Sequence, residues 1–150
     1  MTKAQELLSG VALATFRLNG QLLAVAEEMA RPAGLTAAWW QVLGAVLTTP
    51  LPVVGIARTM GITRQSVQRI ADLLVDQGLA EYQPNPSHRR AKLLRPTDEG
   101  YDAVRRINPA HAALARRLAN EMGTDAFRRA LDALTRLSEA LDVAAPTAAL

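Results

Sequence analysis

Two groups of polar and basic side chains lie close together in the sequence and could contact a polyanion. The first is "TRQSVQR" at 63–69, which follows a glycine. The second is "PNPSHRRAKLL" at 84–94, in which two prolines and an asparagine precede a cluster of basic residues. Arg and Lys neutralise phosphates, and Arg and Gln can form paired hydrogen bonds with base edges. These residue types therefore support recognition of a nucleic acid.

Basic residues are concentrated around these two groups. The whole chain has 17 basic and 14 acidic residues, which gives a net charge of +3. Between Arg64 and Arg95 there are six basic and three acidic side chains, so about a fifth of the chain has a surplus as large as that of the whole. The placement of charge, more than its total, indicates where an anionic partner binds.

The neighbouring elements predict how these side chains are positioned. "PVVGIARTM" (52–60) predicts a short helix with Pro52 as its first residue, and Gly61 predicts a tight turn after it. An amphipathic helix follows over 64–78, with Thr63 as its cap. A short helix, a glycine turn and a second helix are the signature of a helix-turn-helix, whose second helix enters the major groove of DNA.

The second of these helices is predicted to bury one face and expose the other. The predicted buried residues lie at helical spacing: Val67, Ile70, Ala71 and Leu74. The residues predicted to contact DNA lie at its start: Thr63, Arg64, Gln65, Ser66, Gln68 and Arg69. An ordinary solvated helix face is the alternative interpretation, and the glycine turn and the basic loop argue against it.

Two short runs of strand-forming residues, at 79–83 and 91–95, predict a β-hairpin after this helix. The loop between them, 84–90, is longer than a usual hairpin connection, and long loops in compact domains are often functional. A basic hairpin beside a reading helix is a wing, whose arginines can enter the minor groove. The wing residues predicted to contact DNA are His88, Arg89, Arg90 and Lys92. Solvated loop charges are the alternative.

Long apolar stripes lie in the sequence before and after these predicted elements. Leu7 to Met29 predicts a long first helix, and Val104 to Leu141 predicts the last two helices, the final one capped by Thr124. The end "AAPTAAL" is expected to fray. A composition that is 49% hydrophobic and 4% aromatic favours helices over sheets. Because the stripes exceed what one small lobe needs, they predict a dimer.

The stretch 52–100 resembles the DNA-binding lobe of the MarR family of bacterial regulators. The resemblance is carried by "TRQSVQRIADLLVDQGL", then "NPSHRRAKLL", then "TDEG", and the long flanking helices match the family's dimerisation region. His88 and Pro96 depart from the family's pattern, which usually has an acidic residue and a leucine at these places. The implied fold class is mainly α with a small β-hairpin wing: a winged helix-turn-helix lobe plus long dimerisation helices.

The resemblance implies a single domain over 1–150, with the lobe at 36–100 and dimerisation helices at 1–35 and 101–145. It also implies a homodimeric cytoplasmic transcription regulator, usually a repressor, that binds a pseudo-palindromic operator in double-stranded DNA. A small effector, frequently aromatic or phenolic, would bind between the lobe and the dimerisation helices. Trp39 and Trp40 are candidates for lining that pocket, with core or interface packing as the alternative.

Other classes of function find little support in the sequence. The absence of cysteine excludes disulfides and thiolate metal sites, and His88 and His111 have no partners at metal-ligand spacing, so no metal or cofactor is expected. No phosphate-binding loop or nucleophile motif predicts an enzyme. No segment has the ~18 uncharged apolar residues of a membrane span, so no membrane partner is expected. The rival hypotheses are a winged-helix adaptor that does not bind DNA and a carrier of small ligands.

Overall fold

The chain folds into six α-helices and a small antiparallel sheet in a computed structural model that describes residues 1–145. This confirms the expected fold class. Residues 146–150, which belong to the end predicted to fray, lie outside the described residues. The helices are α1 Lys3–Ala30, α2 Ala37–Val46, α3 Val53–Met60, α4 Arg64–Asp76, α5 Asp98–Met122 and α6 Thr124–Ala144, with a 3-10 turn η1 at Arg31–Ala33.

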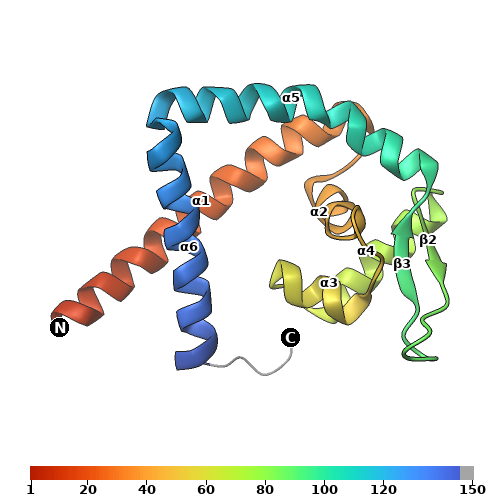
Figure 1. Cartoon of the computed structure of the whole chain (residues 1–150), viewed down its shortest axis with the longest axis horizontal. Helices are drawn as coiled ribbons and strands as arrows, with labels where there is room; N and C mark the ends of the chain where they lie inside the picture. The colour runs from red at the N-terminus through yellow and green to blue at the C-terminus, as the bar shows by residue number, and fades with distance from the viewer. Residues whose placement is uncertain (146–150) are drawn as a thin grey trace.

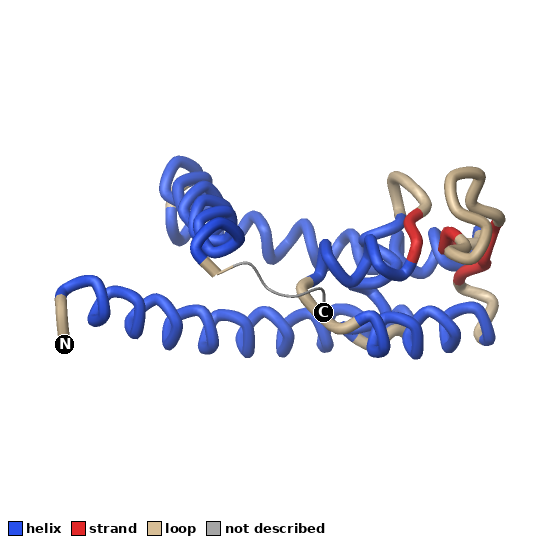
Figure 2. Tube along the Cα trace, turned by 90° about the horizontal axis from the view of Figure 1, so that it is seen from below, coloured by secondary structure: helices blue, strands red, loops and turns tan. Residues whose placement is uncertain are grey.

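The lobe and the long helices occupy different regions of the molecule. In Figure 1, α2, α3, α4 and the sheet cluster on one side, whereas α1 extends away from them toward the N-terminus. α5 crosses the top of this view from the lobe, and α6 descends from its far end. Figure 2 shows from a second direction that the first part of α1 continues beyond the other helices as an arm.

The sheet has three short strands, β1 Leu51–Pro52, β2 Ala80–Gln83 and β3 Leu93–Pro96. β3 lies in the middle and pairs antiparallel with both others, so β2 and β3 are the predicted hairpin. β1 has no signal in the sequence, because two residues cannot show an alternating pattern. The expectation that Pro52 begins α3 is wrong. Pro52 pairs with Leu93 in the sheet and is the N-cap residue, so that α3 begins at Val53.

α3, Gly61 and α4 form the helix-turn-helix that the sequence predicts. Gly61 has a φ of 67°, a left-handed conformation that ends α3 without steric cost. Thr63 caps α4, because its Oγ1 accepts a hydrogen bond of 3.1 Å from the amide of Ser66. The predicted buried residues of α4 are at most 4% exposed: Val67, Ile70, Ala71 and Leu74. The division of α4 into a buried and an exposed face is therefore confirmed.

α5 is fixed to the lobe at its first turn, in the sequence "TDEG". Thr97 Oγ1 accepts a hydrogen bond of 3.2 Å from the Gly100 amide and donates one of 2.6 Å to the carbonyl oxygen of Gly78. The Thr97 amide donates to the carbonyl oxygen of Leu79 at 3.1 Å. A Cβ added to Gly100 would overlap that same Leu79 oxygen, so this close approach requires glycine. Pro96 is buried at the same junction.

The corner between α5 and α6 is a single residue. Gly123 has a φ of 81° and is both the C-cap of α5 and the N-cap of α6. The expectation that Thr124 caps α6 is wrong, because Thr124 is already the first helical residue and no side chain bonds to this helix start. α5 continues through Pro109, so the corner at Gly123 is where the chain leaves that helix.

Buried hydrophobic residues belong to the lobe and to the helix segments that touch it. Among the described residues they begin at Ala30 and end at Ile107. Within that part of the chain, α1 before Ala30 and the whole of α6 contribute no buried residue. The apolar stripes predicted on the long helices therefore lie largely exposed on a single copy of the chain.

Candidate nucleic-acid interface

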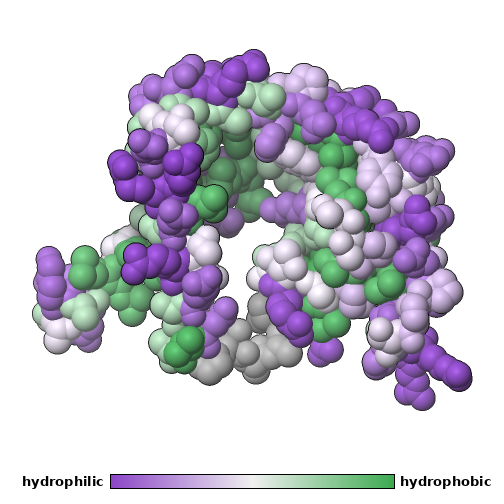
Figure 3. Space-filling view, in the orientation of Figure 1, coloured by the Kyte–Doolittle hydropathy of each residue, from purple (hydrophilic) through white to green (hydrophobic). Residues whose placement is uncertain are grey.

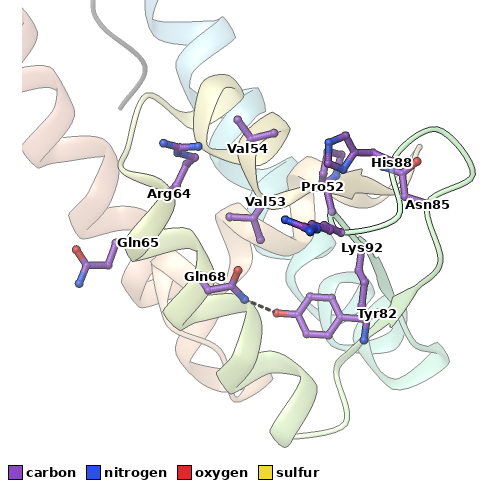
Figure 4. Close-up of a pocket in the computed structure, with 12 residues that line it drawn as sticks. Pro52, Val53, Val54, Arg64, Gln65, Gln68, Tyr82, Asn85, His88 and Lys92 are labelled. Atoms are coloured by element: carbon purple, nitrogen blue, oxygen red, sulfur yellow. Dashed lines mark hydrogen bonds between the residues drawn. The ribbon is translucent and has the colours of Figure 1, made fainter.

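α4 and the wing, which consists of β2, β3 and the loop 84–92, face each other across a cleft of about 830 Å³ (Figure 4). The first residues of α3 form its apolar part, with Val53 and Val54. Its polar lining comes from both α4 and the wing: Arg64, Gln65, Gln68, Asn85, His88, Arg90 and Lys92. Cations on both sides of one concave surface suit a phosphate backbone, and the amides between them suit base edges.

The six residues predicted to contact DNA at the start of α4 fall into three groups. Those that line the cleft are Arg64, Gln65 and Gln68. Arg69 is exposed outside the cleft lining. Thr63 and Ser66 are engaged with each other, because the Thr63 hydroxyl donates to Ser66 Oγ at 2.9 Å and accepts from the Ser66 amide. These two residues build the start of the helix from which the others project.

The wing residues predicted to contact DNA are all exposed, and three of them line the cleft: His88, Arg90 and Lys92. Arg89 is exposed but is not part of that lining. Arg95 at the base of the wing pairs with Glu81 on the neighbouring strand, with 3.4 Å between Nε and Oε1. Among residues 1–145, Arg95 is the one basic residue of the wing that has a carboxylate oxygen within 4.0 Å. The cations nearer the tip are therefore available to an anionic partner.

Asn85 organises the tip of the wing. Its side-chain Oδ1 accepts a hydrogen bond of 3.0 Å from the Ser87 amide, and its carbonyl oxygen accepts one of 3.2 Å from the His88 amide. The His88 carbonyl oxygen then accepts from the Ala91 amide at 3.3 Å. Two successive turns therefore fold the loop between the prolines and β3, and they hold His88 and Arg90 at the cleft.

A closed set of three hydrogen bonds joins α4 to the wing. Gln68 Nε2 lies 3.0 Å from Asp72 Oδ1 and 2.9 Å from Tyr82 Oη, and Tyr82 Oη lies 2.6 Å from the same Asp72 oxygen. Burial, followed by the hydrogen bond to Asp72 and its negative charge, raises the pKa of Tyr82 to about 12. The Tyr82 hydroxyl is therefore protonated at neutral pH and donates a hydrogen bond to the carboxylate.

Sequence reasoning missed Asp72, Tyr82 and Asn85 as parts of this site. Gln68 and Asp72 lie four residues apart on one helix, a spacing that brings side chains together, but the sequence does not show that a tyrosine from the wing closes the set. Asn85 has a stronger local signal, because asparagine side chains commonly bond to the backbone two residues later in turns.

A second, more apolar cavity of about 410 Å³ lies between α1, α2, α5 and α6. Trp40 and His111 face each other in its lining, with ring centroids 5.9 Å apart and planes at 88°. Trp39 is half-buried against the hydrophobic core and does not line this cavity. Of the two tryptophans predicted as pocket residues, Trp40 lines this cavity and Trp39 does not. No three potential metal ligands come together anywhere in residues 1–145.

The fold and the cleft define the class of this molecule: a winged helix-turn-helix protein with long flanking helices. Residues 33–91 match the model of the MarR family. Together with the structural neighbours, this match shows that the chain belongs to the MarR family of transcription regulators. The resemblance noted in the sequence is therefore confirmed.

Relatives extend the match over nearly the whole chain. Uncharacterized proteins of Mycobacterium tuberculosis and Mycobacterium bovis are 38% identical over 131 residues, which is 87% of this chain and 92% of theirs. The repressor CouR bound to a 23-mer DNA duplex is 27% identical with a TM-score of 0.76, over 92% of this chain and 99% of that one. CouR from Rhodococcus jostii RHA1 bound to p-coumaroyl-CoA is 26% identical with a TM-score of 0.69, over 92% and 94%.

Proposed function

We propose that this protein is a homodimeric transcription repressor that binds a pseudo-palindromic operator in double-stranded DNA. The observation that carries the proposal is the cleft between α4 and the wing, whose lining brings Arg64, Gln65 and Gln68 of α4 together with Arg90 and Lys92 of the wing. Such a surface can neutralise phosphates while its amides contact bases. The CouR structure with a DNA duplex supports the same use of this fold.

Each element has a distinct role in the proposed complex. The start of α4 enters the major groove, where Arg64 and Gln65 reach base edges. The wing lies along the backbone beside it, and its tip arginines enter the adjacent minor groove, where the negative potential of A·T-rich DNA is strongest. This division of labour is that of a regulator, and we propose no catalytic role for the chain.

Exposed apolar side chains on α1 and α6 support homodimerisation. Figure 3 shows hydrophobic residues gathered on the projecting part of α1 and in the hollow below α5. Large apolar side chains exposed on these helices include Leu8 at 61%, Phe16 at 71% and Leu131 at 64%. Burying apolar surface stabilises an assembly by about 25 cal/mol per Å², so these faces favour association with a second copy. Such a dimer would present two α4 helices to successive major grooves, about 34–36 Å apart.

The segment Lys3–Ala33 is long and apolar enough to cross a membrane by length and composition alone. Two contacts favour its use as a dimerisation arm. Glu27 Oε2 accepts a hydrogen bond of 2.8 Å from the Ala37 amide at the start of α2, and Ala30 is completely buried in the lobe's core. Arg17 also interrupts the apolar run. We therefore infer a cytoplasmic protein whose first helix packs against protein.

The cavity beside Trp40 is the proposed site for a small aromatic or phenolic effector. Its lining is mainly apolar, with Asn19, Gln41 and His111 as polar groups that could bind a hydroxyl or carboxylate. CouR in complex with p-coumaroyl-CoA supports a ligand of this chemistry. Because the cavity is bounded by α1, α5 and α6 together with α2, a ligand there would change how the lobe sits on the dimerisation helices.

Selection of bound duplexes from a random pool tests the proposed function. The expected result is an inverted repeat with half-site centres about one helical turn apart. Its affinity should fall steeply as salt rises, because bound phosphates release counterions. Failure of the wild-type protein to enrich any duplex would reject DNA binding and favour the winged-helix adaptor. Retention of a small aromatic ligand without DNA binding would favour the carrier.

A further inference from the structure

We propose that Tyr82 sets the base preference of Gln68 by occupying that side chain's N–H donors, so that Gln68 presents only its amide oxygen to DNA. The proposal rests on the proposed DNA-binding function. It adds a specificity-determining residue that does not itself touch a base, because Tyr82 acts through Gln68.

The hydrogen-bond chemistry fixes the orientation of the Gln68 amide. An ionised carboxylate can only accept hydrogen bonds, so the two groups that face Asp72 Oδ1, at 3.0 Å and 2.6 Å, must both donate. These groups are Gln68 Nε2 and the Tyr82 hydroxyl. The hydroxyl has one hydrogen, which it uses in the bond to Asp72. It therefore accepts a hydrogen bond from Gln68 Nε2 at 2.9 Å. Both acceptors lie on the nitrogen side of the Gln68 amide, so its N–H donors are directed into this set of bonds.

The remaining polar atom of Gln68 is its carbonyl oxygen. Figure 4 shows the Gln68 nitrogen directed at Tyr82 and the oxygen on the other side of the amide, toward the cleft. A free glutamine forms two bonds with adenine, donating to N7 and accepting from N6, but this one can only accept. In the major groove adenine N6 and cytosine N4 donate, whereas guanine and thymine present acceptors. A half-site position that contacts Gln68 should therefore tolerate adenine and cytosine equally and disfavour guanine and thymine.

Tyr82 is held firmly enough to impose this state. It lies on β2 opposite Leu94 of β3, which is completely buried. Its ring is half-buried, and Asp72 is one turn beyond Gln68 on α4. A phenylalanine at this position would keep the ring in place and remove only the hydroxyl, which releases one N–H of Gln68 toward the cleft.

Binding-site selection on three variants tests the proposal. The wild type should accept adenine and cytosine about equally at one position of each half-site. Tyr82→Phe should favour adenine over cytosine there by about two- to tenfold, the value of one added hydrogen bond. Gln68→Ala should lose the preference at this position. Tyr101→Phe is the matched control, because the Tyr101 hydroxyl donates to the Leu47 carbonyl oxygen at 3.2 Å and lies outside the cleft lining.

Three results would overturn the proposal. One is a Tyr82→Phe profile identical to the wild type, including the case in which affinity falls but base preference does not, since Tyr82 would then be purely structural. The second is an unchanged preference in Gln68→Ala. The third is an equal change in Tyr101→Phe. Failure of the proposed function is distinguishable from all of these, because it would show as no enriched duplex with the wild type itself.

Discussion

The lobe and the long helices use apolar residues in opposite ways. In the lobe, Leu43, Ile56 and Leu94 are completely buried, whereas Leu8 on α1 and Leu131 on α6 are more than half exposed. The lobe therefore forms its own core within one chain, and the long helices carry apolar surface that residues 1–145 leave uncovered. The comparison teaches that the shape of the lobe is fixed within one chain, whereas in the proposed dimer the placement of two lobes depends on contact between chains.

The largest expected effect is a loss of stability from a substitution at the junction between the lobe and α5. Gly100→Ala places a Cβ against the Leu79 carbonyl oxygen, which is backbone and cannot rotate away. We expect a loss of about 2–4 kcal/mol in the free energy of unfolding, at or above the usual cost of overpacking. Urea unfolding of the variant measures this loss.

Gly44→Ala is the control for that change. Gly44 lies in α2, and a Cβ there would meet nothing within 4 Å. Since alanine favours a helix over glycine, this variant should gain about 0.5–1 kcal/mol. Equal destabilisation by both substitutions would show that the junction at Gly100 has no special role.

The next effect concerns the long helices and should leave the lobe folded. Leu131→Asp on α6 puts a charge on the proposed dimer face, and we expect the dimer dissociation constant to rise at least about a hundredfold, equivalent to about 3 kcal/mol. Sedimentation measures the association. Leu73→Asp on α4 changes an exposed leucine of the lobe and should leave the dimer intact. A Leu131→Asp protein that still sediments as the wild type would contradict the proposed interface.

A smaller effect is expected at the wing. Arg90→Ala removes a cation from the cleft and should weaken operator binding severalfold, with a salt dependence shallower by about one unit. Arg89→Ala should weaken binding as well, because both arginines at the tip of the wing are exposed and are proposed to enter the minor groove. Arg105→Ala on α5, where Asp102 already pairs with the arginine, is the control that should change neither quantity. Equal slopes for Arg90→Ala and the wild type would exclude a wing contact with phosphate.

The smallest effect is a pH dependence from Tyr82. Its pKa is raised to about 12 in the folded protein, from an ordinary value of 10.0. Folding therefore favours the protonated hydroxyl, and this stabilisation is complete below pH 10 and is lost as the pH rises toward 12. The difference in stability between the wild type and Tyr82→Phe should shift against the wild type over that interval in urea unfolding. A difference that stays constant from pH 9 to 12 would contradict the bond to Asp72.

Local sequence patterns predict the helix-turn-helix of the lobe well, because the residues that determine each turn, cap and buried face lie close together in the sequence. The cap at Thr63, the turn at Gly61 and the buried face of α4 all follow from helix geometry. β1 could not be predicted, since its two residues gain their structure only by pairing with β3. The bond between Tyr82 and Asp72 is equally invisible, because it joins side chains ten positions apart through tertiary packing. The steric role of Gly100 likewise depends on Leu79, which the sequence places 21 residues earlier.

The junction at Thr97 has a mechanical consequence. Gly78 and Leu79 follow Gln77, the C-cap of α4, and Thr97 is the N-cap of α5. Two hydrogen bonds and one close contact therefore join the end of one helix to the beginning of the other. The joint contains no flexible linker that could absorb a rotation. A tilt of α5 would be passed to the end of α4 through these contacts, and in the proposed complex α5 would act as a lever on the helix that enters the major groove.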